Sequence, residues 1–261
     1  MDKNELLREA QNENQISGIY NLCDRWCEKC KYTSRCLTFT INQKRFRDGI
    51  LSPAIPEFWE QIHSLLNATK ELLDDYIRLH KIPMPTEKEQ KEIDAQRSEV
   101  DRKIKSNHLV VESEKYFKDV VGFMKEQNHF LPKIEESDEE SEEENSEQKT
   151  GLFDPRRDII KEAIEIIIYY SPFMYVKIAR TMHGIFDNED KENDYMGDIL
   201  VSSRLVVVAI ERSMAAWHIL FNEYKPQHEN VIEFLLKLND LKKGIEALIP
   251  EVKTYKRPYF D

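Results

Sequence analysis

The spacing of apolar residues along the chain predicts a protein made of α-helices. Apolar side chains recur at intervals of three and four residues over long segments, which places them on one face of a helix. These stripes cover residues 57–81, 108–127, 154–183, 195–224 and 231–248. Only seven of the 261 residues are glycine, and strand-like runs are few. We therefore expect an all-α fold, in the form of a multi-helix bundle.

Capping and helix-breaking residues mark the ends of these stripes. Thr86 followed by Glu89 has the pattern of a capping box, and it opens a thinly apolar helix that we expect on the outside. Asp154 as N-cap and Pro155 at the first helical position open the next long helix. Pro172 falls inside that helix and is expected to kink it or split it in two.

The helix that begins at Pro155 is expected to be the central one. Its apolar residues surround nearly the whole circumference, which is typical of a helix buried on all sides. They are Ile159, Ile160, Ala163, Ile164, Ile166, Ile167 and Ile168. In the helix that follows, the expected core positions are Ile199, Leu200, Val206, Val207, Ile210, Met214, Trp217 and Phe221.

Three shorter segments complete the expected structure. Residues 16–29 contain no proline and are expected to form a short helix. Apolar and polar residues alternate at the start of 37–51, which indicates a short extended segment. The aromatic tail at 255–260 is expected to pack back on the body of the protein.

All four cysteines of the chain fall within one stretch of fourteen residues. Their spacing is C-x3-C-x2-C-x5-C, formed by Cys23, Cys27, Cys30 and Cys36. Cysteines that only filled a core would be scattered along the chain. Their clustering predicts one shared metal centre, since thiolates are ligands of zinc and of iron–sulfur clusters. On a helix the first three would share one face, and the following loop would deliver Cys36.

The sequence leaves the cofactor open between a [4Fe–4S] cluster and Zn²⁺. Compact runs of cysteine favour iron–sulfur ligation, whereas structural zinc usually has two C-x2-C-like pairs and this chain shows one. Zinc becomes feasible if the helix ends near Glu28, because a straight helix separates Cys23 and Cys30 by roughly 10 Å. Four thiols without a metal are the remaining alternative. The basic residues that would offset the thiolate charge are Arg25, Lys29, Lys31 and Arg35.

Cys23, Cys27 and Cys30 have the C-x3-C-x2-C spacing of the radical-SAM cluster motif, so the chain resembles that family over eight residues. The resemblance would imply a partial (β/α) barrel, a glycine-rich cofactor segment and one open iron position. Scarce glycine and few strand-like runs do not fit that fold, and Cys36 is available to close the open position. We therefore do not assign the chain to this family.

Charge and hydropathy limit the partners. Nine residues between Glu135 and Glu147 are acidic and account for most of the net charge of −11. Such a segment is expected to be a solvated loop, and it is the candidate site for a protein partner. No basic patch suits a nucleic acid, and no apolar run is long enough to span a membrane. The polar N-terminal start is unlike a signal peptide, which predicts a cytoplasmic protein with reduced thiols.

A second candidate site lies on the C-terminal helices. Arg204, Glu211 and His218 follow one another at steps of seven, so they form a polar ridge that can face Glu165 on the preceding helix. In an enzyme these four would be the catalytic candidates, in a pocket between helices. The alternative is a network of structural ion pairs without a ligand. A Glu-x-x-His pair at Glu60 has di-iron spacing but no second copy.

The sequence thus divides into five parts, with the helical parts forming one domain. They are a four-cysteine segment at 1–51, a helical part at 52–131, an acidic linker at 132–153, core helices at 154–250 and a tail at 251–261. The leading hypothesis is a cytoplasmic helical metalloprotein with a redox, electron-transfer or sensing role. Alternatives are a non-catalytic scaffold with structural zinc and a partner-binding acidic loop, or an enzyme. Substrate, partner and oligomeric state are beyond the sequence.

Overall fold

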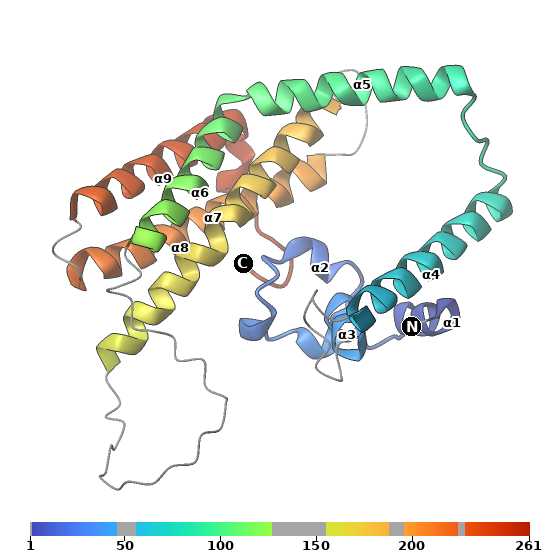
Figure 1. Cartoon of the computed structure of the whole chain (residues 1–261), viewed down its shortest axis with the longest axis horizontal. Coiled ribbons are helices and arrows are strands. Elements are labelled where there is room, and N and C mark those ends of the chain that lie inside the picture. Colours follow the sequence, from blue (N-terminus) through green and yellow to red (C-terminus); the bar gives the residue numbers. More distant parts are fainter. Residues whose placement is uncertain (1, 46–55, 127–154, 188–195, 224–227) are drawn as a thin grey trace, which may run out of the picture. The chain divides into compact units, whose positions relative to one another are not determined.

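The computed structural model describes residues 2–45, 56–126, 155–187, 196–223 and 228–261 (Figure 1). The α-helices in these ranges are α1 Lys3–Ala10, α2 Ile19–Leu22, α3 Leu37–Arg45, α4 Pro56–His80, α5 Glu87–Ser106, α6 His108–Glu126, α7 Pro155–Asp187, α8 Met196–Glu223 and α9 His228–Leu248. Short 3₁₀ helices are η1 Cys27–Lys29, η2 Thr33–Arg35 and η4 Pro250–Lys253. The described residues contain no strand, which confirms the all-α fold.

The long helices form where the amphipathic stripes predicted them. At the start of α5 the predicted capping box is present: the Thr86 N–H donates to the Glu89 carboxylate at 2.8 Å, and the Glu89 N–H donates to the Thr86 hydroxyl at 3.3 Å. No residue of α5 is buried, as expected for an outer helix. In the described part of the chain, no helix has the length and apolarity to cross a membrane. The acidic segment lies outside the described residues.

The chain divides into two compact units. Unit 1 contains Met1–Gln96 together with the last four residues, Pro258–Asp261, and unit 2 contains Arg97–Arg257. The division falls inside α5, and therefore inside the 52–131 part that the sequence treated as one. The domain boundaries expected from the sequence stay a prediction. Both ends of the chain belong to unit 1.

In the described residues of unit 2, the helices α6, α7, α8 and α9 pack together, and each contacts two of the others. α7 contacts α6 and α8, and α9 likewise contacts α6 and α8. α6 and α9 each turn one mainly apolar stripe inward, as ridge-into-groove packing requires. On α6 the buried stripe is Val110, Ser113, Tyr116, Val120 and Met124, and on α9 it is Val231, Phe234, Leu238, Leu241 and Ile245. The core of the protein therefore lies in this unit.

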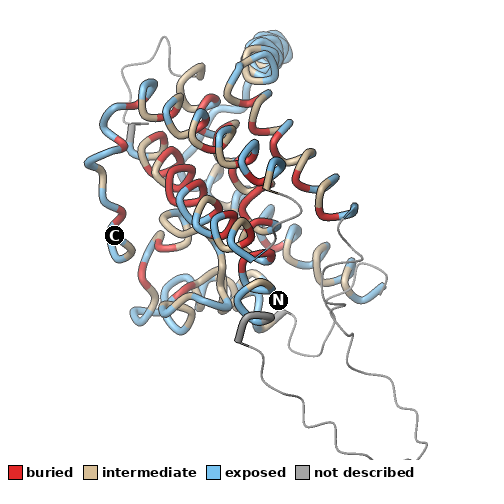
Figure 2. The backbone as a smooth tube through the Cα atoms, turned by 90° about the vertical axis from the view of Figure 1, so that its left-hand side faces the viewer, coloured by how far each residue is buried: buried red, intermediate tan, exposed pale blue. Residues whose placement is uncertain are grey.

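The most deeply buried helix is α8 and not α7, so the prediction of a central helix at 155 is wrong (Figure 2). Nine of the ten residues in 201–210 are buried. On α7 only one stripe is buried, and Ile159 and Ile168 are 49% and 50% exposed. The reason is the number of neighbours, because α8 also contacts η4 after α9. A run of isoleucines does not reveal how many neighbours will cover it.

Pro172 lies inside α7, which runs unbroken from Pro155 to Asp187. Of the two predicted outcomes, the split is therefore wrong, whereas a kink at Pro172 stays a prediction. Proline removes one backbone hydrogen bond from a helix. Packing on both sides of it compensates here, because Tyr170 and Met174 are fully buried.

Unit 1 has a much thinner core than unit 2. Its buried apolar side chains in the described ranges are Ile16, Ile19, Cys36 and Ala68. The long helix α4 contributes only Ala68, and it packs on α1. Several of its large apolar residues remain more than half exposed, namely Trp59, Leu66, Leu73, Tyr76 and Leu79. Burial alone therefore stabilises unit 1 weakly.

Candidate metal centre

The cysteine segment does not form the helix predicted over 16–29. α2 ends at Leu22, and Cys23 has an extended backbone with φ −104° and ψ 162°. Arg25 then adopts φ 62°, in the left-handed region, and turns the chain. The side chain of Asp24 accepts a hydrogen bond from the Trp26 N–H at 3.3 Å, and such local bonds compete with helix formation.

The extended segment predicted from Leu37 is also wrong, because these residues form α3. The Thr40 N–H donates to the Cys36 carbonyl at 2.9 Å, which starts the helix directly after the last cysteine. α3 packs on α1 and η2, and Phe39 contacts the small core of the segment. Tertiary packing here overrides the strand preference of alternating β-branched and aromatic residues. We call residues 16–45 the cysteine module.

Cys27 and Cys30 are brought together by a single 3₁₀ turn. η1 begins at Cys27, and the Cys30 N–H donates to the Cys27 carbonyl at 3.1 Å. Residues three apart eclipse each other in a 3₁₀ helix, so these two side chains lie on one side. A second 3₁₀ turn, η2, ends at Cys36 in the same way. Two short 3₁₀ turns therefore carry Cys27, Cys30 and Cys36 in place of the predicted helix face.

Backbone N–H groups donate to two of the sulfurs. The Tyr32 N–H lies 3.4 Å from the Cys30 sulfur. The N–H of Arg25 is hydrogen-bonded to Cys23 and lowers the pKa of its thiol. In both cases the donor lies two residues after the cysteine. Donors placed in this way stabilise a thiolate more than a thiol.

The four thiols are close enough to influence one another electrostatically. Burial raises the pKa of Cys27, and the nearby thiols of Cys23, Cys36 and Cys30 raise it further. Burial is also the main cause of the raised pKa of Cys23, with Asp24 and Cys36 adding to it. Without a counter-ion the thiols of Cys23 and Cys27 are therefore held in the neutral form at pH 7.

The structure gathers the cysteines without bringing them into bonding geometry. All four are free thiols. Within the described ranges, no three His, Cys, Asp or Glu side chains stand together closely enough to hold one metal ion. The donor set nevertheless fits a soft metal in its chemistry: it consists of four thiols from one short segment, two of which accept hydrogen bonds from backbone N–H groups. Cys23, Cys27, Cys30 and Cys36 would hold it.

Cys36 differs from the other cysteines in its surroundings. It is 9% exposed and forms a small apolar cluster with Ile16 and Ile19. The Ile16 N–H donates to the Arg35 carbonyl at 2.9 Å. This hydrogen bond joins the first residue of the module to the residue before Cys36. The other three cysteines are partly exposed. A metal would therefore sit between a small apolar core and solvent.

The basic residues among the cysteines are directed partly to aromatic rings and to the backbone. The ammonium group of Lys29 lies 5.0 Å from the centre of the Trp26 ring, and that of Lys31 lies 5.0 Å from the Tyr32 ring. Arg35 donates to the carbonyl of Asn14 at 3.1 Å. The basic residue whose charge acts on a sulfur is Arg25, which lowers the pKa of the Cys23 thiol. That charge would favour a tetrathiolate centre.

The polar ridge on α8 lies toward solvent. Glu211 is exposed and forms an ion pair with Lys242 at 2.7 Å. His218 is exposed and stacks on Phe221, and Glu165 on α7 is exposed as well. Arg204 is half-buried. The structure therefore gives no support to a shared pocket, and catalysis by these four residues stays a prediction.

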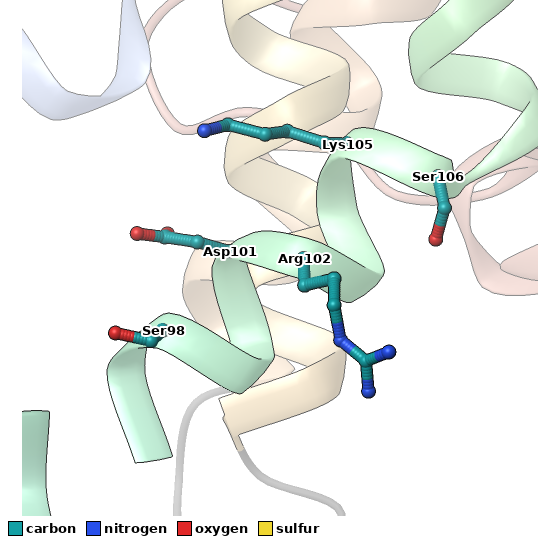
Figure 3. Close-up of a pocket in the computed structure, with 5 residues that line it drawn as sticks. All are labelled: Ser98, Asp101, Arg102, Lys105 and Ser106. Carbon is teal, nitrogen blue, oxygen red and sulfur yellow. The ribbon is translucent and has the colours of Figure 1, made fainter. Parts of the chain in front are cut away.

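Two surface hollows lie away from the cysteines. Glu60 and His63, the pair with di-iron spacing, line one of them together with Asp2 and Lys3 at the start of α1, and both are exposed. The other is lined from α5 alone, by Ser98, Asp101, Arg102, Lys105 and Ser106 (Figure 3). Figure 3 shows Asp101 and Lys105 directed to one side of the helix and Arg102 to another. Such an open polar surface suggests no particular ligand.

The aromatic residues that complete the module come from both ends of the chain. Tyr32, Phe39 and Phe260 pack against the cluster around Cys36. Of the tail predicted to pack back at 255–260, Phe260 contacts this cluster, whereas the residues up to Arg257 group with unit 2. The role of Tyr32 had no signal in the sequence. Comparison with known protein families, curated proteins and solved structures found no significant match.

Proposed function

We propose that the protein binds one metal centre through Cys23, Cys27, Cys30 and Cys36, and that this centre folds the cysteine module. One observation supports the proposal most: the module has four neighbouring thiols but a core of only three buried side chains. Segments of about 40 residues or fewer seldom fold on burial alone and usually need a disulfide, a metal or a partner. The four thiols make a metal one such route within the chain, in addition to the packing of α3 on α1 and of Phe260 on the apolar cluster.

Zinc is the metal that this arrangement favours. Four thiolates fill the tetrahedral coordination of Zn²⁺ and leave no open position, which is typical of a structural site. Such a site contributes several kcal/mol to folding. The two N–H donors to sulfur and the basic residues nearby would offset the excess negative charge of the thiolates. Binding would release protons, since thiols bind metal as thiolates.

A [4Fe–4S] cluster is the second candidate, favoured by the compact C-x3-C-x2-C-x5-C spacing. A [4Fe–4S] cluster is larger than a single zinc ion, so it can be held by sulfurs that are neighbours without being in contact. In that case electron transfer or redox sensing would be the natural role, and partly exposed Cys23, Cys27 and Cys30 would give a partner access to the cluster. The ligand residues are the same in both candidates.

Anaerobic purification followed by elemental analysis and an absorption spectrum tests the proposal. One zinc per chain in colourless protein supports the structural site. About four irons per chain with broad absorbance near 400 nm supports the cluster. Full-length protein that carries neither metal, does not take up zinc or reconstituted cluster, and keeps a folded module would refute the proposal. A helical scaffold whose acidic segment binds a partner would then become the leading hypothesis.

A further inference from the structure

Tyr32 connects the cysteines to the C-terminal tail, which we define as Pro258–Asp261. Its backbone N–H donates to the Cys30 sulfur at 3.4 Å. Its hydroxyl donates to the backbone carbonyl of Tyr259 at 2.8 Å, across 227 residues of sequence. One residue therefore touches a candidate metal ligand through its main chain and the tail through its side chain.

Aromatic contacts add to this hydrogen bond. The Tyr32 ring meets the Phe260 ring edge-on with centroids 5.5 Å apart, and the Tyr259 ring at 6.2 Å. Phe260 also packs against the apolar cluster that contains Cys36. The tail thus lies on a surface formed between the third and fourth cysteines. These four residues group with unit 1, whereas the chain immediately before them belongs to unit 2.

We propose that metal binding at the four cysteines holds the C-terminal tail on the cysteine module, so that loss of the metal releases the tail. This inference rests on the function proposed above. It adds a regulated docking surface to that site, with the chain's own aromatic tail as its occupant.

The physical basis is conformational order. A metal bonded to Cys30 and Cys36 closes a short loop that contains Tyr32. Ordering each residue of a flexible segment costs free energy. With metal bound, the loop that contains Tyr32 is already ordered before the tail docks. The hydroxyl and the ring of Tyr32 are then in position to contact the tail. Without metal, docking of the four tail residues must also order the loop from Cys30 to Cys36. The free energy gained from the few contacts of the tail is smaller than the cost of ordering this loop.

Trimming of the tail measures its docking in the 261-residue chain. Purified protein, loaded with one zinc or treated with a chelator, is digested with a serine carboxypeptidase, which needs no metal. Intact mass then follows the loss of Asp261, Phe260 and Tyr259. We expect trimming to be at least ~10-fold slower in the zinc-loaded protein, because a docked chain end must first detach.

Two variants separate the Tyr32 contact from general effects. Tyr32→Phe removes the hydroxyl donor but keeps the ring and the N–H bond to Cys30, so trimming of zinc-loaded protein should accelerate about 3- to 10-fold. Tyr259→Phe is the matched control, because this residue accepts through its main chain. It should be trimmed as slowly as the wild type. Both variants should keep one zinc per chain.

The outcomes distinguish the two proposals. If one zinc is bound and the tail is trimmed equally fast with and without it, the tail inference is wrong while the metal site stands. The same conclusion follows if Tyr32→Phe and Tyr259→Phe behave alike. If no metal binds, the function proposed above fails, and this inference fails with it.

Discussion

The indole N–H of Trp217 donates a hydrogen bond of 2.9 Å to the hydroxyl of Tyr116 inside unit 2. Both side chains are fully buried, and the bond joins α6 to α8 across 101 residues. Phe234 from α9 stacks on the Trp217 ring at 4.5 Å and meets the Tyr116 ring edge-on at 5.9 Å. Three helices of the bundle therefore meet at one aromatic cluster with a satisfied polar pair.

Tyr116→Phe should destabilise unit 2 by about 1–3 kcal/mol, because it leaves the buried Trp217 N–H without an acceptor. Urea unfolding followed by tryptophan fluorescence measures the change. Tyr76→Phe is the control, since the Tyr76 side chain is 55% exposed and solvent replaces its hydroxyl contacts. Equal stability of the two variants would show that the Trp217 bond contributes nothing.

Unit 2 should lose stability as the pH rises above 10. Burial raises the pKa of Tyr116 well above its ordinary value of 10.0. The unfolded chain therefore releases this proton before the folded chain does, and stability that is complete below pH 10 declines above it by about 1.4 kcal/mol per pH unit. Denaturation midpoints between pH 8 and 11 test this. In Tyr116→Phe the slope of stability against pH above pH 10 should be shallower by that amount. An identical slope in the variant and the wild type would show that Tyr116 does not cause the decline.

Two helical glycines should respond oppositely to alanine. Gly122 on α6 has no neighbouring atom within 4 Å of an added Cβ, so Gly122→Ala should stabilise by about 0.5–1 kcal/mol through helix propensity. At Gly244 on α9, an added Cβ would clash with a terminal methyl carbon of Leu109. Displacing that side chain should outweigh the propensity gain, and Gly244→Ala should cost about 1 kcal/mol. Thermal melting of both variants beside the wild type decides the sign.

Replacing Cys27 and Cys36 separately tests what the cysteines do for folding. With a metal centre, Cys27→Ala and Cys36→Ala should each abolish metal binding and each unfold the module, at a cost of several kcal/mol. Without one, only Cys36→Ala should matter, because Cys36 is 9% exposed in the apolar cluster and Cys27 is partly exposed. Metal content and hydrogen exchange of 16–45 measure both effects. If the two variants lose only a little stability, and by different amounts, the cysteines do not share a metal centre.

The sequence predicted the long helices well, because their stability comes from periodic apolar faces that are visible locally. α4 was expected at 57–81 and runs from Pro56 to His80. Which helix is most buried was not predictable in the same way. The isoleucines of α7 made it look central, but burial depends on how many neighbours pack around a helix, and η4 adds one to α8.

The cysteine module was predicted in composition but not in geometry. The four sulfur positions were visible in the sequence, whereas the turns that carry them depend on local hydrogen bonds such as that from Trp26 to Asp24. α3 was missed because its alternating residues resemble a strand, and only contacts with α1 and η2 make it helical. Tyr32 was not recognisable as a link, because its partner Tyr259 lies 227 residues away.

Because Pro258–Asp261 groups with unit 1, a change at these four residues acts on the same unit as the first 96 residues. Removal of residues 258–261 would strip Phe260 from the apolar cluster around Cys36. An affinity tag fused after Asp261 would crowd the same surface. Recombinant forms of this protein are therefore better tagged at another position, although the cysteines lie near the opposite terminus.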